Sequence, residues 1–217
     1  MALQTAGPTR RHAVDRARHR SFKIVVTGPF DAGKTTLIRT ISEIAVVSTE
    51  RDVSTYDHGV VGQRHSGRTT VAMDFGRVSL ADDLALHLFG TPGQERFEFM
   101  WQILAEGMLG FVLVVDASRP ETIAEAREQH LYFRDLAEVP LVVAVNKLPR
   151  DRGTGAALTR IRRQLGLPDH VPVLAADARR REEVKAVLVA LLRALLRQLP
   201  GTVTSLPAAV PDRVAGQ

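Results

Sequence analysis

The sequence has no cysteine among its 217 residues. Disulfides, thiolate zinc sites and cysteine nucleophiles are therefore excluded. The sequence also lacks any run of about 18 apolar residues, so no segment is expected to span a membrane. Its first twenty residues contain no apolar stretch of the kind that a secretory signal requires. These absences together predict a cytoplasmic protein.

Positive charge is concentrated at the start of the chain. The net charge is +5, and residues 1–20 hold five arginines against one aspartate, which is +4, so the remainder is close to neutral. Such an arm can touch nucleic acid, acidic lipid or an acidic partner. Because no aromatic residue lies among these arginines, we expect no specific nucleic acid as a partner. We predict a disordered arm whose association with a membrane surface is at most transient.

Apolar, β-branched runs alternate with helical patterns along the rest of the chain. The expected strands are 22–27, 71–79, 84–89, 110–115, 141–145 and 171–175, and the expected helices are 34–44, 95–106, 121–136, 155–165 and 181–199. The short link "LADD" is typical of an antiparallel hairpin, whereas continuous apolar strands are typical of a buried parallel sheet. The predicted fold class is α/β: a three-layer, doubly wound, mostly parallel six-stranded sheet with one antiparallel edge strand.

This pattern divides the chain into three parts. Residues 1–20 form the basic arm, residues 21–199 one phosphate-loop domain, and residues 200–217 a flexible tail rich in Pro, Ala, Val and Gly. Inside the domain, the stretch 45–69 is long, polar and without periodicity. A loop of this length in a compact domain is usually functional or disordered.

The stretch "GPFDAGKTT" lies between the first expected strand and the first expected helix. It matches the phosphate-loop pattern Gly28-x-x-x-x-Gly33-Lys34-Thr35 in full. The glycines let backbone N–H groups face a phosphate, Lys34 neutralises the β and γ oxygens, and the Thr35 hydroxyl binds Mg²⁺. The helix that begins at Lys34 directs its positive end toward the same phosphates. The sequence therefore predicts a site for a nucleoside di- or triphosphate.

Four further motifs follow in order along the chain: "TTVAMDF" at 69–75, "FGTPGQERF" at 89–97, "VAVNKLP" at 143–149 and "ADAR" at 176–179. With the phosphate loop, they resemble the motifs of Ras-like small GTPases over roughly residues 21–199. The combination is most similar to bacterial small GTPases of the conservon type, relatives of the gliding-motility polarity GTPase. The resemblance implies GTP or GDP with Mg²⁺, and a role as a signalling switch. It also implies two partners, a roadblock-fold regulator and a sensor-kinase-like protein of the same signalling module.

The resemblance also implies roles for individual residues. Gly93 would contact the γ-phosphate, Gln94 would orient the attacking water, Thr70 would bind Mg²⁺ from the long loop, and the Ala178 N–H would bind guanine O6. The expected nucleotide-binding residues are Asp31, Ala32, Gly33, Lys34, Thr35, Thr36, Thr70, Gly93, Asn146, Lys147, Asp177, Ala178 and Arg179. The expected catalytic residues are Gln94, Lys34 and Arg68, and the expected metal ligands are Thr35 and Thr70.

Two positions depart from the small-GTPase pattern. Gly90 stands where the wider family has an aspartate that holds Mg²⁺ through a water. Asp74 is near Gly90 in sequence and belongs to the motif "TTVAMDF", which is similar to a motif of the Rab branch of small GTPases. The aspartate of the Rab motif has no metal role, so we expect Asp74 to be a spectator at the metal site. Pro149 replaces the aspartate that reads guanine, with Asp151 as a weaker candidate to replace it. We therefore expect a weaker Mg²⁺ site and a blunted preference for guanine.

Phe30 occupies a loop position that is glycine in Ras. A bulky side chain near the γ-phosphate would hinder Gln94, so intrinsic hydrolysis is expected to be slow. Arg68 precedes Thr70 by two residues and is a candidate arginine finger, with a solvated loop arginine as the alternative.

We interpret the chain as a switch that binds GTP and slowly hydrolyses it to GDP and phosphate. Two alternatives stay open. Gly90 and Pro149 are compatible with a phosphate-loop ATPase or kinase-like enzyme of relaxed base specificity. Phe30 and Gly90 are compatible with a scaffold that binds nucleotide without hydrolysing it.

Overall fold

A computed structural model describes residues 20–48, 73–93, 98–149 and 153–198. Seven strands form one sheet in the order β2-β3-β4-β1-β5-β6-β7. Their bounds are β1 Arg20–Thr27, β2 Val47–Ser48, β3 Asp74–Ala81, β4 Leu84–Gly90, β5 Met108–Asp116, β6 Leu141–Asn146 and β7 Val173–Ala175. The strands from β4 to β7 pair in parallel, whereas β3 pairs antiparallel with both β4 and β2. The predicted α/β fold with a mostly parallel sheet is confirmed.

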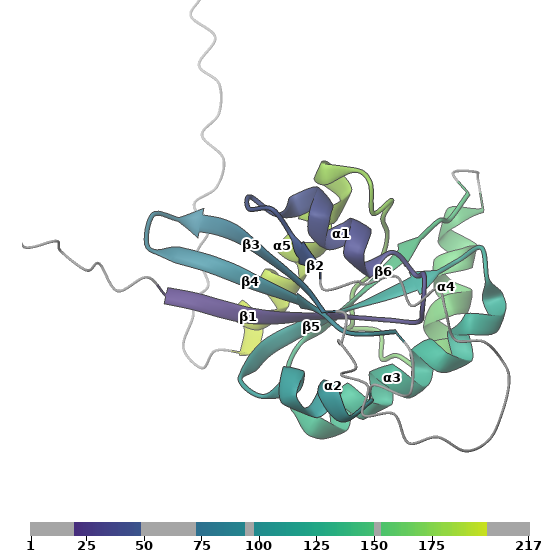
Figure 1. The fold of residues 1–217 in the computed structure, drawn as a ribbon. Helices are drawn as coiled ribbons and strands as arrows, with labels where there is room; N and C mark the ends of the chain where they lie inside the picture. Colours follow the sequence, from purple (N-terminus) through teal and green to yellow (C-terminus); the bar gives the residue numbers. More distant parts are fainter. Residues whose placement is uncertain (1–19, 49–72, 94–97, 150–152, 199–217) are drawn as a thin grey trace, which may run out of the picture.

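Helices cover both faces of the sheet, which gives three layers (Figure 1). The helices are α1 Lys34–Ile41, α2 Glu98–Ala105, α3 Ile123–Leu136, α4 Thr154–Leu165 and α5 Arg181–Gln198, and a 3-10 turn, Pro120–Thr122, precedes α3. Apolar side chains of α1 and α5 pack on one face, against residues such as Val26 and Val112. Those of α2, α3 and α4 pack on the other face, against residues such as Val25 and Leu113. The alternation of neighbouring residues between two cores explains why most of β5 is a continuous apolar run and why β1 contains the unbroken apolar stretch Ile24–Val26.

Several element ends differ from the sequence prediction. Helix α1 ends at Ile41 because Ser42 adopts an extended conformation, and its hydroxyl accepts hydrogen bonds from the N–H groups of Ile44 and Arg77. Strand β7 begins after Pro172, which has no N–H for a strand ladder. The two-residue β2 lies beyond β3, so β3 is not the outermost strand of the sheet.

The order of the strands places the loop after β1 at a switch point of the sheet. Strand β1 lies between β4 and β5, and the chain leaves it toward α1 on one face while β5 leads to α3 on the other. In open α/β sheets, ligands bind at the carboxyl ends of the strands where the order reverses. In the described ranges, none of the helices combines the length and apolar character that a membrane-spanning segment needs.

Candidate nucleotide-binding site

Lys34 is the first residue of α1, and its side chain reaches back into the loop between β1 and α1. Its Nζ donates hydrogen bonds to the carbonyl oxygens of Gly28 and Pro29, each at 2.7 Å. The side chain is buried, and this burial lowers the pKa of Lys34 to about 8, although the carboxylates of Glu125, Asp74 and Asp31 act in the opposite direction. A buried ammonium ion at the start of a helix is well placed to bind an anion.

Gly93 lies directly against this loop. A Cβ atom at Gly93 would lie 2.6 Å from Lys34 Nζ and 2.7 Å from the backbone N of Phe30, so only glycine allows so close an approach. The stretch that follows β4 therefore contacts the phosphate loop through its backbone. This position is compatible with the predicted contact between Gly93 and a γ-phosphate.

Asn146, at the end of β6, connects the phosphate loop to the segment after β7. Its amide Nδ2 donates to the carbonyl of Ala32 at 2.9 Å, and its Oδ1 accepts the N–H of Ala178 at 3.1 Å. The N–H of Ala178, which the resemblance assigns to guanine, thus binds Asn146 in this structure. A side-chain amide that joins two segments in this way fixes the position of one segment relative to the other.

A cavity of about 830 Å³ opens beside Asn146. The expected nucleotide-binding residues that line it are Asp31, Gly33, Thr36, Asn146, Lys147, Asp177, Ala178 and Arg179. Its volume lies in the range of ligand pockets in proteins. The structure therefore brings residues from three separate motifs to one cavity next to the phosphate loop.

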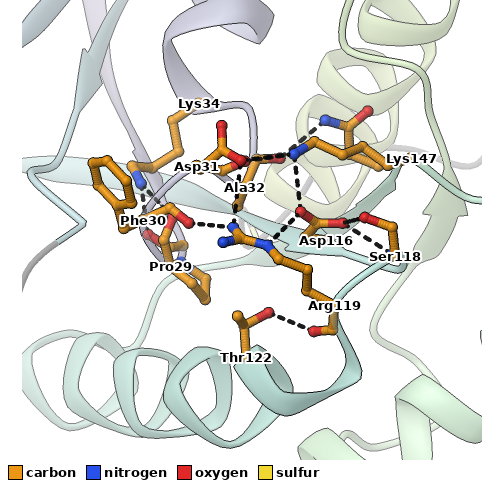
Figure 2. A network of polar contacts seen from close by, with 12 residues as sticks. Pro29, Phe30, Asp31, Ala32, Lys34, Asp116, Ser118, Arg119, Thr122 and Lys147 are labelled. Carbon is orange, nitrogen blue, oxygen red and sulfur yellow. Dashed lines mark hydrogen bonds and ion pairs between the residues drawn. The ribbon is translucent and has the colours of Figure 1, made fainter.

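A charged clamp fixes the outer side of the phosphate loop (Figure 2). We use this name for Asp31, Asp116, Arg119 and Lys147. Lys147 Nζ bonds the Asp31 carbonyl at 2.9 Å and Asp116 Oδ2 at 2.9 Å, and Arg119 donates to the Phe30 carbonyl at 2.6 Å. The sequence analysis did not identify Asp116 or Arg119. The sequence signal that could have identified Asp116 is its position as the carboxylate that ends the apolar run of β5.

Asp116 is fully buried within the clamp. Burial alone would raise its pKa, but hydrogen bonds from Ser118, Lys147 and Arg119 outweigh burial and lower the pKa of Asp116 to about 2. The same carboxylate opposes the effect of desolvation on Lys147 and raises the pKa of that lysine. Both groups are therefore charged at neutral pH, and their attraction joins β5 to β6 and to the phosphate loop.

Asp177 and Arg179 form a pair at the entrance of α5. Arg179 donates to both carboxylate oxygens of Asp177, at 2.8 and 2.9 Å, and the Asp177 N–H donates to Glu183 at 2.8 Å. Arg179 is exposed. These contacts set the shape of the cavity wall.

Thr35, the expected metal ligand of the phosphate loop, is hydrogen-bonded to Asp74. Its hydroxyl donates to Asp74 Oδ2 at 2.5 Å, and Asp74 is buried at 8% exposure. Asp74 is therefore in contact with the expected metal ligand, a neighbour that the sequence pattern did not predict. The reason is the antiparallel register of β3 and β4, which places Asp74 beside Gly90 and within reach of the first turn of α1.

The residues present fit a divalent cation bound together with phosphates. No group of three or more His, Cys, Asp or Glu side chains suited to a metal occurs in the described parts of the chain. Mg²⁺ at nucleotide sites needs no such group, because it keeps several waters and takes one or two protein oxygens with the substrate phosphates. The Thr35 hydroxyl and the buried Asp74 carboxylate suit that chemistry, since one oxygen of Asp74 has no hydrogen-bond partner in the part of the chain that the structure describes.

Residues 26–198 match the family described as "Conserved hypothetical ATP binding protein". The chain belongs to this family. Together with the phosphate-loop geometry, membership of this ATP-binding family establishes a nucleotide-binding protein of the phosphate-loop class.

Individual relatives cover different shares of the chain. An uncharacterized protein of Methanocaldococcus jannaschii is 30% identical over 125 residues, which are 58% of this chain and 69% of that protein. Translation initiation factor IF-2 of Picosynechococcus is 30% identical over 73% of this chain, but the match covers only 14% of the factor. Intraflagellar transport protein 22 of Chlamydomonas reinhardtii is 27% identical, over 54% of this chain and 53% of that protein.

Four candidate residues lie outside the described residues. These are Arg68, Thr70, Gln94 and Asp151. Their roles stay predictions.

Proposed function

We propose that this member of the ATP-binding family is a switch that binds GTP and slowly hydrolyses it to GDP and phosphate, within a bacterial signalling module. The observation that carries the proposal is the position of Lys34 and the loop around it, directly beside the cavity that Asn146, Lys147 and Ala178 line. A phosphate site next to a base-sized cavity suits a nucleotide that spans both.

The chain's own residues account for binding of the phosphates. Lys34 exchanges its bonds to the Gly28 and Pro29 carbonyls for bonds to phosphate oxygens. The N-terminus of α1 adds the partial positive charge of its free N–H groups. Thr35 presents its hydroxyl at the same place, and the bound Mg²⁺ supplies neutralisation of the charge on the β- and γ-phosphates.

The proposed slow hydrolysis follows from the surroundings of Phe30. Its side chain is 61% exposed on the outer turn of the loop, and Arg119 fixes its carbonyl. The backbone N and Cα of Phe30 lie directly against Gly93, where the attacking water and the predicted Gln94 would have to enter, and the exposed ring would narrow that entrance. Removal of that steric hindrance by a partner is the proposed point of regulation.

One observation favours a second nucleotide, ATP. Pro149 lines the cavity where a guanine-reading carboxylate is expected, and proline offers no side-chain acceptor for the guanine N1–H. The description of the family as ATP-binding points the same way. The base therefore has to be decided by measurement.

The test is a competition titration of a fluorescent guanine nucleotide with unlabelled GDP, GTP, ADP and ATP. The proposal expects guanine forms to bind at least about 100-fold more tightly, which is roughly 2.7 kcal/mol. Equal competition by ATP would replace GTP by ATP in the proposal. Lys34→Ala is expected to abolish binding, whereas Lys185→Ala, an exposed lysine on α5, is the matched control. Tight binding by Lys34→Ala would contradict the phosphate-site assignment.

A further inference from the structure

Asp74 is a buried carboxylate with half of its hydrogen-bonding capacity unused. Its Oδ2 accepts the Thr35 hydroxyl, but its Oδ1 has no hydrogen-bond partner among the described residues and is shielded from solvent. Burial of a charged oxygen without a partner is costly, and natural proteins seldom retain such a group without a use for it. The free oxygen lies on the same carboxyl group that holds a phosphate-loop hydroxyl.

Strand register brings Asp74 to the position where β4 lacks a carboxylate. Asp74 pairs with Gly90 across the antiparallel β3–β4 ladder. A Cβ atom at Gly90 would lie 3.0 Å from the Asp74 Cβ, 3.2 Å from Asp74 Oδ2 and 3.0 Å from Ile38 Cδ1. A side chain at position 90 and the side chain of Asp74 therefore compete for one space beside α1.

The charge of Asp74 also acts on the phosphate site. Its carboxylate opposes the lowering of the Lys34 pKa by burial, so the two groups are close enough to interact through a poorly solvated interior. Asp74 thus contacts the hydroxyl of Thr35 and electrostatically influences Lys34. Both of these residues belong to the phosphate loop.

We propose that Asp74, on β3, is the carboxylate of the divalent-cation site and replaces the one that Gly90 lacks on β4. It positions the Thr35 hydroxyl through Oδ2, and Oδ1 takes a water of the hydrated cation as its partner. The inference rests on the proposed function, because the cation would bind with the nucleotide phosphates. It assigns the metal-binding role to a strand that runs in the opposite direction to β4.

Moving the carboxylate from position 74 to position 90 gives a direct test of this inference in the full chain. Asp74→Asn keeps the size of the side chain and removes its charge. The double variant Asp74→Gly/Gly90→Asp moves the carboxylate to β4 and removes the Asp74 atoms that would collide with it. Asp82→Asn, an exposed carboxylate in the turn at the far end of the same hairpin, is the matched control.

Two readouts separate the metal site from the nucleotide site. Electron paramagnetic resonance measures Mn²⁺ affinity in the presence of GDP or ADP, whichever binds. Release of a fluorescent nucleotide, with Mg²⁺ or with EDTA, measures how strongly the cation retains the nucleotide. Asp74→Asn is expected to lose 10- to 100-fold in Mn²⁺ affinity, with nucleotide binding in EDTA unchanged. The double variant is expected to recover most of this loss, and Asp82→Asn to match the wild type.

Wild-type Mn²⁺ affinity in Asp74→Asn would overturn the inference. A loss in Asp74→Asn that the double variant does not recover would also overturn it, because the effect would then come from altered packing around β3. Failure of the wild-type chain to bind any nucleotide in the presence of Mg²⁺ would instead refute the proposed function. The two failures are therefore distinguishable.

Discussion

At the scale of single residues, Lys34 has the most unusual environment in the phosphate loop. Its ammonium group is buried and bonded only to backbone carbonyls in the contacts described. Burial penalises the charged form, and the pKa of Lys34 falls to about 8. Phosphate oxygens would favour the charged form, so nucleotide binding should raise this pKa and take up a proton from solvent at alkaline pH.

We predict that nucleotide binding is coupled to protonation of Lys34. The affinity for nucleotide should be highest below pH 8 and fall as the pH rises above 8. The reason is that Lys34 of the free protein then loses a proton, which it must regain in the complex. At pH 8.5 a group with a pKa of about 8 is about three-quarters neutral, so roughly 0.7 proton should be taken up per nucleotide. Calorimetry in two buffers of different ionisation enthalpy measures this number. The same titration at pH 6.5 is the control, and no uptake at pH 8.5 would contradict the prediction.

At the scale of elements, the charged clamp joins three segments that are distant in sequence. Asp116 ends β5, Lys147 follows β6, and both attach to the loop between β1 and α1, through Asp31 and through Arg119. Because Asp116 is fully buried whereas its two cationic partners are about one-third exposed, the carboxylate is the least replaceable member. Its loss would leave Lys147 and Arg119 without their shared buried counter-ion and would remove the carboxylate by which β5 is joined to both.

We predict that Asp116→Asn destabilises the fold by about 2 kcal/mol at neutral pH. The folded-state pKa of about 2 lies below the usual 3.8. This carboxylate therefore stabilises the fold fully above about pH 5, and the effect is lost as the pH falls toward 2. The difference in the free energy of unfolding between the wild type and Asp116→Asn, measured by urea unfolding, should thus shrink by roughly half between pH 7 and pH 3. Asp31→Asn, an exposed partner of the same lysine, should cost less than about 1 kcal/mol. A difference between wild type and Asp116→Asn that does not change with pH would contradict this interpretation.

Elements were more predictable from the sequence than their contacts. The apolar runs of β5 and β6 and the pattern Gly-x-x-x-x-Gly-Lys-Thr are local, so strand order in the chain and the phosphate loop follow from neighbouring residues. The Thr35–Asp74 bond joins positions 39 residues apart, and the Arg119–Phe30 bond joins positions 89 residues apart. Such contacts depend on strand register and on which strands are neighbours, and a single sequence does not reveal either. The contact of Asp74 with Thr35 could not be predicted for this reason.

At the scale of the whole molecule, the candidate site connects segments that are distant in sequence. The phosphate loop belongs to β1 and α1, Asn146 to β6, and Ala178 to the entrance of α5. These segments meet at one edge of the sheet, while the helices that cover its two faces pack into separate cores (Figure 1). A nucleotide in the cavity would bridge these segments and stabilise the folded chain as a unit.

We therefore predict that nucleotide raises the unfolding temperature of the entire domain in one transition. A ligand at 100 times its Kd adds about 2.7 kcal/mol to the free energy of unfolding. In a domain of this size that corresponds to an increase of roughly 5–10 °C. Differential scanning calorimetry with the preferred triphosphate and Mg²⁺ measures the shift, and the nucleoside without phosphates is the matched ligand control. Lys34→Ala should show no shift. An equal shift in that variant would mean that the nucleotide binds elsewhere, because a phosphate site built around Lys34 cannot stabilise a chain that lacks it.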